Sequence, residues 1–424
     1  MSLWTYALLL TWIPAFAAVA ADRLDWAACA REAAAANPDV LAAREALERS
    51  HAQHRAGYSP FLPQISADAG YTRGSNTLAQ AGTSFTGSAR DEYSYGLTAR
   101  QSLFSGLRDV AGLDRAALEV EIARARLAIA RASVGADLRT AFAQALFGAR
   151  QIDLSNEIAT RRSGNLELVE LRFASGRENK GSYLRSKAYL AQARFEISQA
   201  SRALAVAQRQ LNRLMFRPVG GPPLEIDGDL ALPKLPPRPE FGALATEVPQ
   251  YTVARAEAQS AEKSVAIARS QFFPDLSVSG SIGRRGATFP PDGDRWSVGL
   301  TLALPIFPGG RNLLELQAAR AEERRAKHVL DSFRDRLGVQ LQEAFAELEN
   351  AVDRAVVQEE FLRAAQLRSE VARTKYTTGL QSFEDWDLIE NDLITTQKSR
   401  LQALHDAWTA QAAWERIAGK AGLP

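Results

Sequence analysis

The chain contains the same long pattern twice. The segment around Phe61-Leu62-Pro63 aligns with the one around Phe272-Phe273-Pro274, and YGLTARQSLFSGLR aligns with SVGLTLALPIFPGGR. A duplication of this length constrains the fold more than any single motif, because the elements predicted in one copy must recur in the other. We expect two structural repeats, at 22–216 and 241–424, with a Pro-rich connector between them at 217–240.

Each repeat contains two segments in which apolar residues alternate with small polar ones, which is the pattern of a β-strand with one apolar face. The predicted strands cover 64–73, 93–104, 275–284 and 296–307. The first repeat is longer between its strands, so an exposed loop tip is predicted within 74–92. Strands of about ten residues with this pattern are typical of transmembrane β-barrels. A soluble sheet packed on a helix is the alternative.

Aromatic residues flank the predicted strands, as they do at the two interfaces of a membrane barrel. Tyr71, Tyr93 and Trp296 lie near the loops, and Phe61, Phe104, Phe272 and Phe307 lie near the helices. Four strands cannot close a barrel, since the smallest membrane barrels have about eight. An unpaired strand edge in lipid is also very costly. We therefore expect several copies of the chain to share one barrel.

Long Ala-rich helices follow the strands. The segment from 107 to 173 has no proline, which at 1.5 Å per residue gives a helix of roughly 100 Å. Shorter helices predicted at 23–58 and 182–215 have a combined length that matches it, so they are expected to pair along a rod. Heptad-like seams with small alanines predict coiled-coil packing. The seam residues are Leu113, Val120, Leu127, Val134, Leu337, Leu341, Ala344, Leu348, Ala351 and Ala355.

The first 21 residues resemble a secretory signal peptide, with an apolar core and small residues before Ala21. An uncleaved anchor is the alternative, because no Lys or Arg precedes the apolar core. Beyond this segment no apolar run approaches the ~18 residues of a membrane-spanning helix. The single cysteine, Cys29, excludes an internal disulfide and is expected to be a small buried residue.

Charge and motifs exclude several classes of function. The chain has 51 basic and 49 acidic residues with no basic stripe, so nucleic acid is not an expected partner. No phosphate loop, nucleophile elbow or paired-carboxylate motif is present, so we expect neither an enzyme nor a cofactor. His51 and His54 have helical i, i+3 spacing that suits a metal, but no third ligand lies nearby, and a solvated helix face is favoured.

The mature chain resembles the TolC-like outer-membrane efflux proteins, also called outer membrane factors. The resemblance rests on the duplicated layout, on the two aligned segments quoted above, and on Ala-Asn-Pro at 36–38. It also rests on Gly176 and Gly379, which follow Arg172-Phe173 and Lys375-Tyr376. The order and spacing of these features across the whole chain are more specific than any one of them.

The resemblance implies a mainly α fold with a transmembrane β-barrel panel, built from tandem helix-strand-strand-helix units. It implies a homotrimer that shares a twelve-stranded β-barrel and a coiled-coil α-barrel, in the outer membrane of a Gram-negative bacterium and reaching into the periplasm. The implied partners are outer-membrane lipid, a periplasmic adaptor (membrane fusion) protein, and an inner-membrane RND, ABC or MFS pump. The channel is expected to conduct drugs, metals or other small molecules passively. Type I protein secretion is the alternative function for such a channel. The alternative from another class of protein is a periplasmic adaptor or scaffold.

The resemblance also implies that turns after the long helices form the periplasmic entrance. Gly176 and Gly379 are the expected turn glycines, and Asp385 occupies the position where the family often has an entrance acid. Further entrance or gate candidates are Glu384, Asp387, Ser182 and Tyr376. Leu388 replaces a second acid that some members carry. The alternative for the acids is stabilisation of a helix N-terminus, which is worth ~0.3–1 kcal/mol.

Overall fold

The computed structural model describes residues 23–74, 77–80, 83–86, 89–218, 220–221 and 224–423, with side chains described from Leu24 on and not for 77–80 and 83–86. The predicted signal peptide and its cleavage position lie outside these residues. The elements in chain order are β1 (Arg23–Leu24), α1 (Trp26–Ala36), α2 (Pro38–Ala56), η1 (Ser59–Phe61), β2 (Gln64–Gly74), β3 (Thr77–Gln80), β4 (Thr83–Thr86), β5 (Arg90–Ser105), α3 (Arg108–Ala174), α4 (Lys180–Leu214), β6 (Glu225–Ile226), α5 (Phe241–Glu247), α6 (Pro249–Ser270), β7 (Asp275–Gly286), β8 (Gly293–Ala303), α7 (Arg311–Thr378) and α8 (Phe383–Ile417).

The chain divides into two compact units, and each unit takes segments from both sequence repeats. Unit 1 comprises Met1–Glu32, Ala141–Ala231 and Glu360–His405, and unit 2 comprises Ala33–Thr140, Leu232–Glu359 and Asp406–Pro424. Unit 2 contains the four-stranded sheet, and unit 1 contains the turns that join the long helices.

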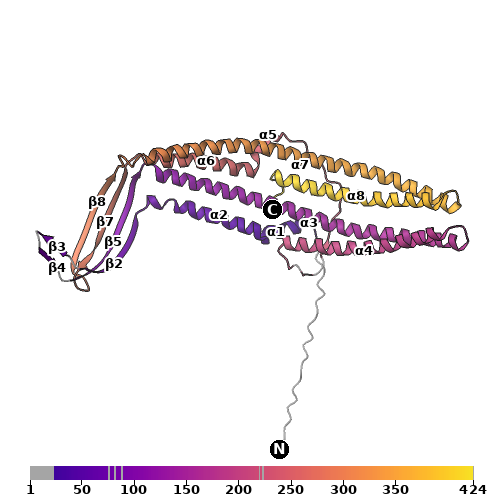
Figure 1. Ribbon diagram of the computed structural model, residues 1–424, viewed down its shortest axis with the longest axis horizontal. Helices are drawn as coiled ribbons and strands as arrows, with labels where there is room; N and C mark the ends of the chain where they lie inside the picture. Colours follow the sequence, from indigo (N-terminus) through magenta and orange to yellow (C-terminus); the bar gives the residue numbers. More distant parts are fainter. Residues whose placement is uncertain are drawn as a thin grey trace, which may run out of the picture. The chain divides into compact units, whose positions relative to one another are not determined.

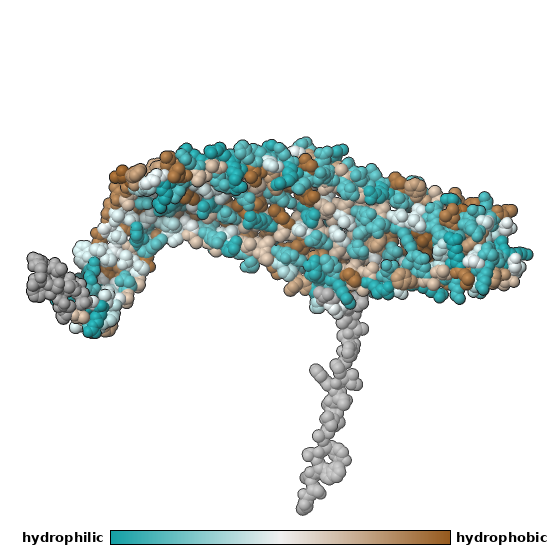
Figure 2. Space-filling view, viewed as in Figure 1, coloured by the Kyte–Doolittle hydropathy of each residue, from teal (hydrophilic) through white to brown (hydrophobic). Residues whose placement is uncertain are grey.

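The sheet in unit 2 is antiparallel, with the order β2-β5-β7-β8 (Figure 1). Its register keeps the predicted alternation in step across the strands. One row pairs Ala67 with Leu97, Ile282 and Trp296, and the next pairs Ser66 with Thr98, Ser281 and Ser297. The sheet therefore has two different faces. We call the face of the Leu97 row the apolar face and the face of the Thr98 row the polar face. Figure 2 shows hydrophobic residues gathered where the strands meet the long helices.

Two glycines face each other on the polar face of the sheet. Gly96 pairs directly with Gly283. A Cβ added at Gly283 would lie 2.4 Å from the Tyr95 carbonyl oxygen, and one at Gly96 would lie 2.9 Å from the Ile282 carbonyl oxygen. Neither position has room for a side chain. Glycine at such a pair allows the backbones to approach closely and the sheet to bend toward its polar face.

The strand boundaries correct two predictions. The fourth strand runs over Gly293–Ala303 instead of 296–307, because Pro305 and Pro308 have no backbone N–H to donate to a ladder. The stretch predicted to be only a loop tip contains β3 and β4, which pair with each other as a two-stranded antiparallel sheet.

The long helices match their predictions, and the first helix does not. α3 covers Arg108–Ala174, one residue from the predicted 107–173. The single helix predicted over 23–58 is wrong, because the chain breaks into α1 and α2 at Asn37. Pro38 has no N–H for the helix ladder, and the Asn37 side chain accepts hydrogen bonds from the Asp39 and Val40 amides as an N-cap.

The predicted coiled-coil seams form the cores of the helical regions. Leu341 and Leu348 of the second seam are fully buried in unit 2, around the Phe345 and Trp414 rings, whose centroids lie 5.1 Å apart. In unit 1, Ile158, Ala193 and Ile394 pack together, and Cys29 is buried as predicted. Among the described helices, none has an apolar stretch of the length needed to cross a bilayer.

Candidate functional site

The turns between the helix pairs in unit 1 are built around the two predicted glycines. Gly176 and Gly379 have φ of 71° and 81°, which is the left-handed conformation that a helix C-terminus requires. The Arg177 amide donates to the Arg172 carbonyl and the Leu380 amide donates to the Lys375 carbonyl, both at 2.8 Å. The same turn is therefore made twice, once in each repeat.

The helices after these turns begin with equivalent caps. The Asn179 side chain accepts from the Ser182 amide at 2.9 Å, and the Ser382 hydroxyl accepts from the Asp385 amide at 3.1 Å. The Ser382 hydroxyl also donates to the Asp385 carboxylate at 2.9 Å. Asp385 thus belongs to the cap of α8, and its side chain is exposed. This contact gives it the stabilising role that an acid has at a helix start.

Stacked aromatic pairs support both turns. The rings of Tyr376 and Trp386 stack at 4.3 Å and 10°, and those of Phe173 and Tyr183 stack at 5.5 Å and 7°. Alignment on Gly176 and Gly379 makes these two pairs equivalent. They differ in burial, because Tyr376 is fully buried whereas Phe173 is 37% exposed.

Tyr376 links the second repeat to the turn of the first. Its hydroxyl donates to the Glu178 carboxylate at 3.0 Å. The Arg172 guanidinium lies 4.6 Å above its ring and donates to its carbonyl oxygen at 2.8 Å. Burial and the Glu178 carboxylate raise the pKa of Tyr376. The hydroxyl therefore stays protonated and acts as a hydrogen-bond donor.

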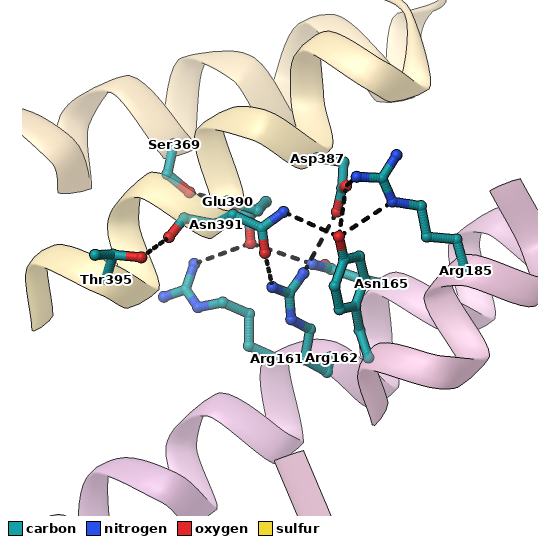
Figure 3. Close-up of polar contacts among 10 residues, drawn as sticks. Arg161, Arg162, Asn165, Arg185, Ser369, Asp387, Glu390, Asn391 and Thr395 are labelled. Atoms are coloured by element: carbon teal, nitrogen blue, oxygen red, sulfur yellow. Dashed lines mark hydrogen bonds and ion pairs between the residues drawn. The ribbon is translucent and has the colours of Figure 1, made fainter. Parts of the chain in front are cut away.

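A charged cluster lies farther along the same helices (Figure 3). The Asp387 carboxylate of α8 lies 3.7 Å from the Arg162 guanidinium of α3 and 3.2 Å from the Arg185 guanidinium of α4. The Tyr189 hydroxyl donates to the same carboxylate at 3.3 Å. The Asp387 and Arg162 side chains are only 5% and 8% exposed.

Glu390 extends this cluster by one helical turn. It is 1% exposed. Its carboxylate accepts hydrogen bonds from the side-chain amide of Asn165 at 3.1 Å and from the Ser369 hydroxyl, and the Arg161 guanidinium lies 3.9 Å away. Asn391 accepts from Arg162. We call these ten residues the inter-repeat network: Arg161, Arg162, Asn165, Arg185, Tyr189, Ser369, Asp387, Glu390, Asn391 and Thr395.

Burial opposes both charges at the centre of the inter-repeat network. It raises the pKa of Asp387, although Arg185 and Arg162 act in the other direction. It also lowers the pKa of Arg162, against the pull of Asp387 and Glu390. The pair therefore costs desolvation energy that its attraction does not fully offset. Removing one partner of such a pair nevertheless destabilises a protein, because it leaves the other charge buried and uncompensated.

The predicted entrance residues differ in their surroundings. Glu384 and Asp385 are exposed, whereas Asp387, Ser182 and Tyr376 are buried within unit 1. Gate roles for all five stay predictions. The sequence did not predict the partners of Asp387, of which Arg162 is the most buried. The spacing of Asp387, Glu390 and Asn391 on one helical face was the available signal for a buried polar seam.

The two histidines lie in unit 2, in an open groove. The groove has a volume of about 760 Å³, and His51, His54 and Glu121 line part of it. No cluster of three metal-ligating side chains occurs among the described residues.

A duplicated chain of long helices that carries an antiparallel sheet with one exposed apolar face has the architecture of an outer-membrane channel with a helical extension. The chain belongs to the outer membrane efflux protein family, whose model matches residues 29–215 and 244–420. It is accordingly a protein of the Gram-negative outer membrane that extends into the periplasm, in a family of channel proteins.

Individual relatives are distant. Fusaric acid resistance protein FusA of Burkholderia cepacia is 25% identical over 324 residues, which are 70% of this chain and 57% of FusA. Alkaline protease secretion protein AprF of Pseudomonas aeruginosa is 25% identical over 306 residues, which are 67% of this chain and 60% of AprF. Among solved structures, the outer-membrane channel OprN is 20% identical, with a TM-score of 0.82 over 92% of this chain and 89% of that chain. The last similarity is one of fold.

Proposed function

We propose that the chain is the exit duct of a tripartite export system. Three copies form a homotrimer whose sheets close a twelve-stranded barrel in the outer membrane, and whose helices form a tunnel in the periplasm. The duct conducts drugs, metals or other small molecules passively. The observation that carries this proposal is the register of the sheet, which gives four antiparallel strands one mainly apolar face whose charges are paired.

The two outer strands of the sheet support a shared barrel. β2 and β8 each have one neighbour in the sheet and therefore one open edge. They run in opposite directions, so β8 of one copy can pair antiparallel with β2 of the next. Pairing satisfies the backbone groups of both edges, which lipid cannot do. A panel of four strands in three copies gives an even-numbered barrel above the lower limit of about eight.

The glycine pair supports the direction of closure. Gly96 and Gly283 leave no room for side chains on the polar face, which suits a sheet that bends toward that face. Bending toward that face places the small polar residues in the lumen and the apolar row of Leu97, Ile282 and Trp296 against lipid.

We assign the turns of unit 1 to the periplasmic entrance. Of the candidate residues there, Asp385 and Glu384 have exposed carboxylates, which suits groups that face a passage. A periplasmic adaptor protein and an inner-membrane pump of the RND, ABC or MFS class complete the system. Type I protein secretion is the second candidate, because AprF, one of the matched relatives, is named a secretion protein.

Cysteine labelling tests the topology. A cysteine at Asp292, in the exposed turn before β8, is introduced after Cys29→Ser, and a second variant places it at Leu380. An impermeant maleimide should label D292C in intact cells and L380C only after the outer membrane is permeabilised. Both variants should run as heat-modifiable trimers from the membrane fraction. Labelling of L380C in intact cells, or a monomer in the soluble fraction, contradicts the proposal.

A further inference from the structure

The polar face of the sheet has more basic than acidic side chains. Charged strand residues on this face, read from the register, are Arg90, Arg100, Arg285, Arg295, Asp68 and Glu92, and Asp275 lies where the strands meet the helices. Asp275 has the Arg108 guanidinium 3.6 Å away. With Asp275, the first residue of β7, the strands carry four basic and three acidic side chains on this face, and the basic partner of Asp275 lies outside them.

Charges on the apolar face are paired, in contrast. Arg284 pairs with Asp294 at 2.9 Å, and Arg73 pairs with Asp91 at 3.6 Å. This arrangement suits a surface against lipid, where an unpaired charge is costly. The polar face of the sheet therefore has a net positive charge, whereas the apolar face is neutral.

Three arginines of the polar face have no acidic partner within ion-pair distance in the part of the chain that the structure describes. They are Arg90, Arg100 and Arg295, and all three are exposed. Arg285 pairs with Glu92. Asp68 lies in the row of Arg295, with Gly96 and Gly283 between them. Three strand spacings separate the two charges by about 14 Å, which is more than the Debye length of about 8 Å at physiological salt.

Closing a ring of copies does not remove this excess. β8 of one copy then lies beside β2 of the next, and Asp68 neutralises at most the neighbouring copy's Arg295. Arg100 and Arg90 stay unbalanced in each copy. A narrow passage with low-dielectric walls focuses such a field and raises the local concentration of ions of opposite sign.

We propose that the barrel part of the duct selects for anionic solutes, and that Arg90 and Arg100 provide this selectivity. This inference rests on the proposed function, because it needs the polar face to line a lumen. It names the substrate class that the duct favours as organic anions, such as carboxylates. Chloride is the simplest probe of the same preference.

Reversal potentials in planar bilayers test the inference. The purified trimer is measured in a gradient of potassium chloride. We expect the permeability ratio of chloride to potassium to fall by about threefold when Arg90→Ser and Arg100→Ser are combined. The Lys variants at both positions retain the charge and should retain the wild-type ratio. The matched control removes the neutral pair of the apolar face, Arg284→Ser with Asp294→Ser, and should leave the ratio unchanged.

The outcomes separate the two proposals. A channel that conducts, but whose ratio is the same in the Ser double variant and in the wild type, overturns the inference and leaves the exit duct intact. A change as large in the apolar-face control also overturns it. A protein that forms trimers in the membrane but no conducting path contradicts the proposed function, and the inference with it. Heat-modifiable trimers in every variant show that assembly is preserved.

Discussion

Arg162 of the first repeat lies 3.7 Å from Asp387 of the second, and both side chains are almost completely buried. This contact joins α3 to α8 in unit 1, and Arg185 joins α4 to the same carboxylate at 3.2 Å. Apolar packing alone permits helices to slide by small steps, whereas a buried charged pair allows one register. We therefore propose that the inter-repeat network sets the register in which the helices of the two repeats pack near their turns.

Removing one member of this pair should loosen the helices in unit 1. Arg162→Ala leaves Asp387 buried with Arg185 as its remaining ion-pair partner, and breaking a buried pair from one side costs about 3–5 kcal/mol. Hydrogen exchange of the α8 amides measures this loss as a local opening free energy. Arg368→Ala is the control, because its pair with Asp392 is exposed and should contribute no more than about 1 kcal/mol. Similar losses in both variants would show that the Asp387 pair is not special.

Stability should depend on pH through Asp387. Its pKa in the folded chain is raised above the ordinary 3.8, with burial as the largest cause. Above pH 3.8 the unfolded chain therefore loses this proton first, and the folded state loses stability as the pH rises to the raised pKa. Above that pKa the loss is constant. The melting temperature of the wild type relative to Asp387→Asn should fall over this window, and a rise would contradict the assignment.

The two caps should contribute similar energies. Asn179→Ala and Ser382→Ala each remove a side chain that accepts a backbone amide at a helix start. Each should cost about 0.5–2 kcal/mol in the first turn of its helix. Thr377→Ala is the control, because its hydroxyl bonds only a carbonyl of its own helix. Hydrogen exchange in the first turns of α4 and α8 gives the measurement, and unchanged exchange in either helix argues against that cap.

The entrance role of Asp385 predicts an effect on conductance. Asp385→Asn removes the charge and keeps an oxygen that can accept from Ser382, so the cap of α8 is preserved. We expect higher single-channel conductance, on the order of twofold, and weaker block by divalent cations. Glu384→Gln should do less, because neighbouring helical residues point about 100° apart. Equal and negligible effects leave Asp385 with its capping role alone.

The glycine pair predicts a defect in barrel assembly. Gly283→Ala places a methyl group 2.4 Å from the Tyr95 carbonyl oxygen, so the strands must move apart. We expect loss of most of the heat-modifiable trimer on unheated gels of the membrane fraction. Gly299→Ala is the matched control on the same face, where the added atom lies 3.9 Å from its nearest neighbour, the Ser279 hydroxyl. Normal assembly of Gly283→Ala would show that curvature does not depend on this pair.

The sequence predicted the elements whose causes are local. Alternation of apolar and polar residues defines each strand, and glycine at 176 and 379 defines the turns. The predicted end of the fourth strand was too late, because Ile306 and Phe307 continue the apolar pattern although Pro305 and Pro308 cannot join a ladder. The apolar pattern continues past Ala303, but the strand ends there because the two prolines cannot donate backbone hydrogen bonds.

The site was less predictable, because its contacts join residues far apart in the chain. Nothing near Asp387 in sequence indicates that Arg162 and Arg185 lie against it, and an exposed helix-start acid has the same local pattern. Burial distinguishes Asp387 from Asp385, since Asp387 lies on the packed side of α8 and Asp385 lies on the solvent side. Which side is packed depends on the helices of the other repeat.

The division of charge in the inter-repeat network has an evolutionary consequence. The guanidinium groups come from the first repeat and the carboxylates from the second. Alignment on the turn glycines places Leu184 at the position of Asp387, and Leu388 at the position of Arg185. A chain made of two first halves would bury Arg162 with no carboxylate, and one made of two second halves would bury Asp387 with no guanidinium. The network therefore requires two halves that differ at these positions, and an exchange of sequence between the halves would leave a buried charge without its partner.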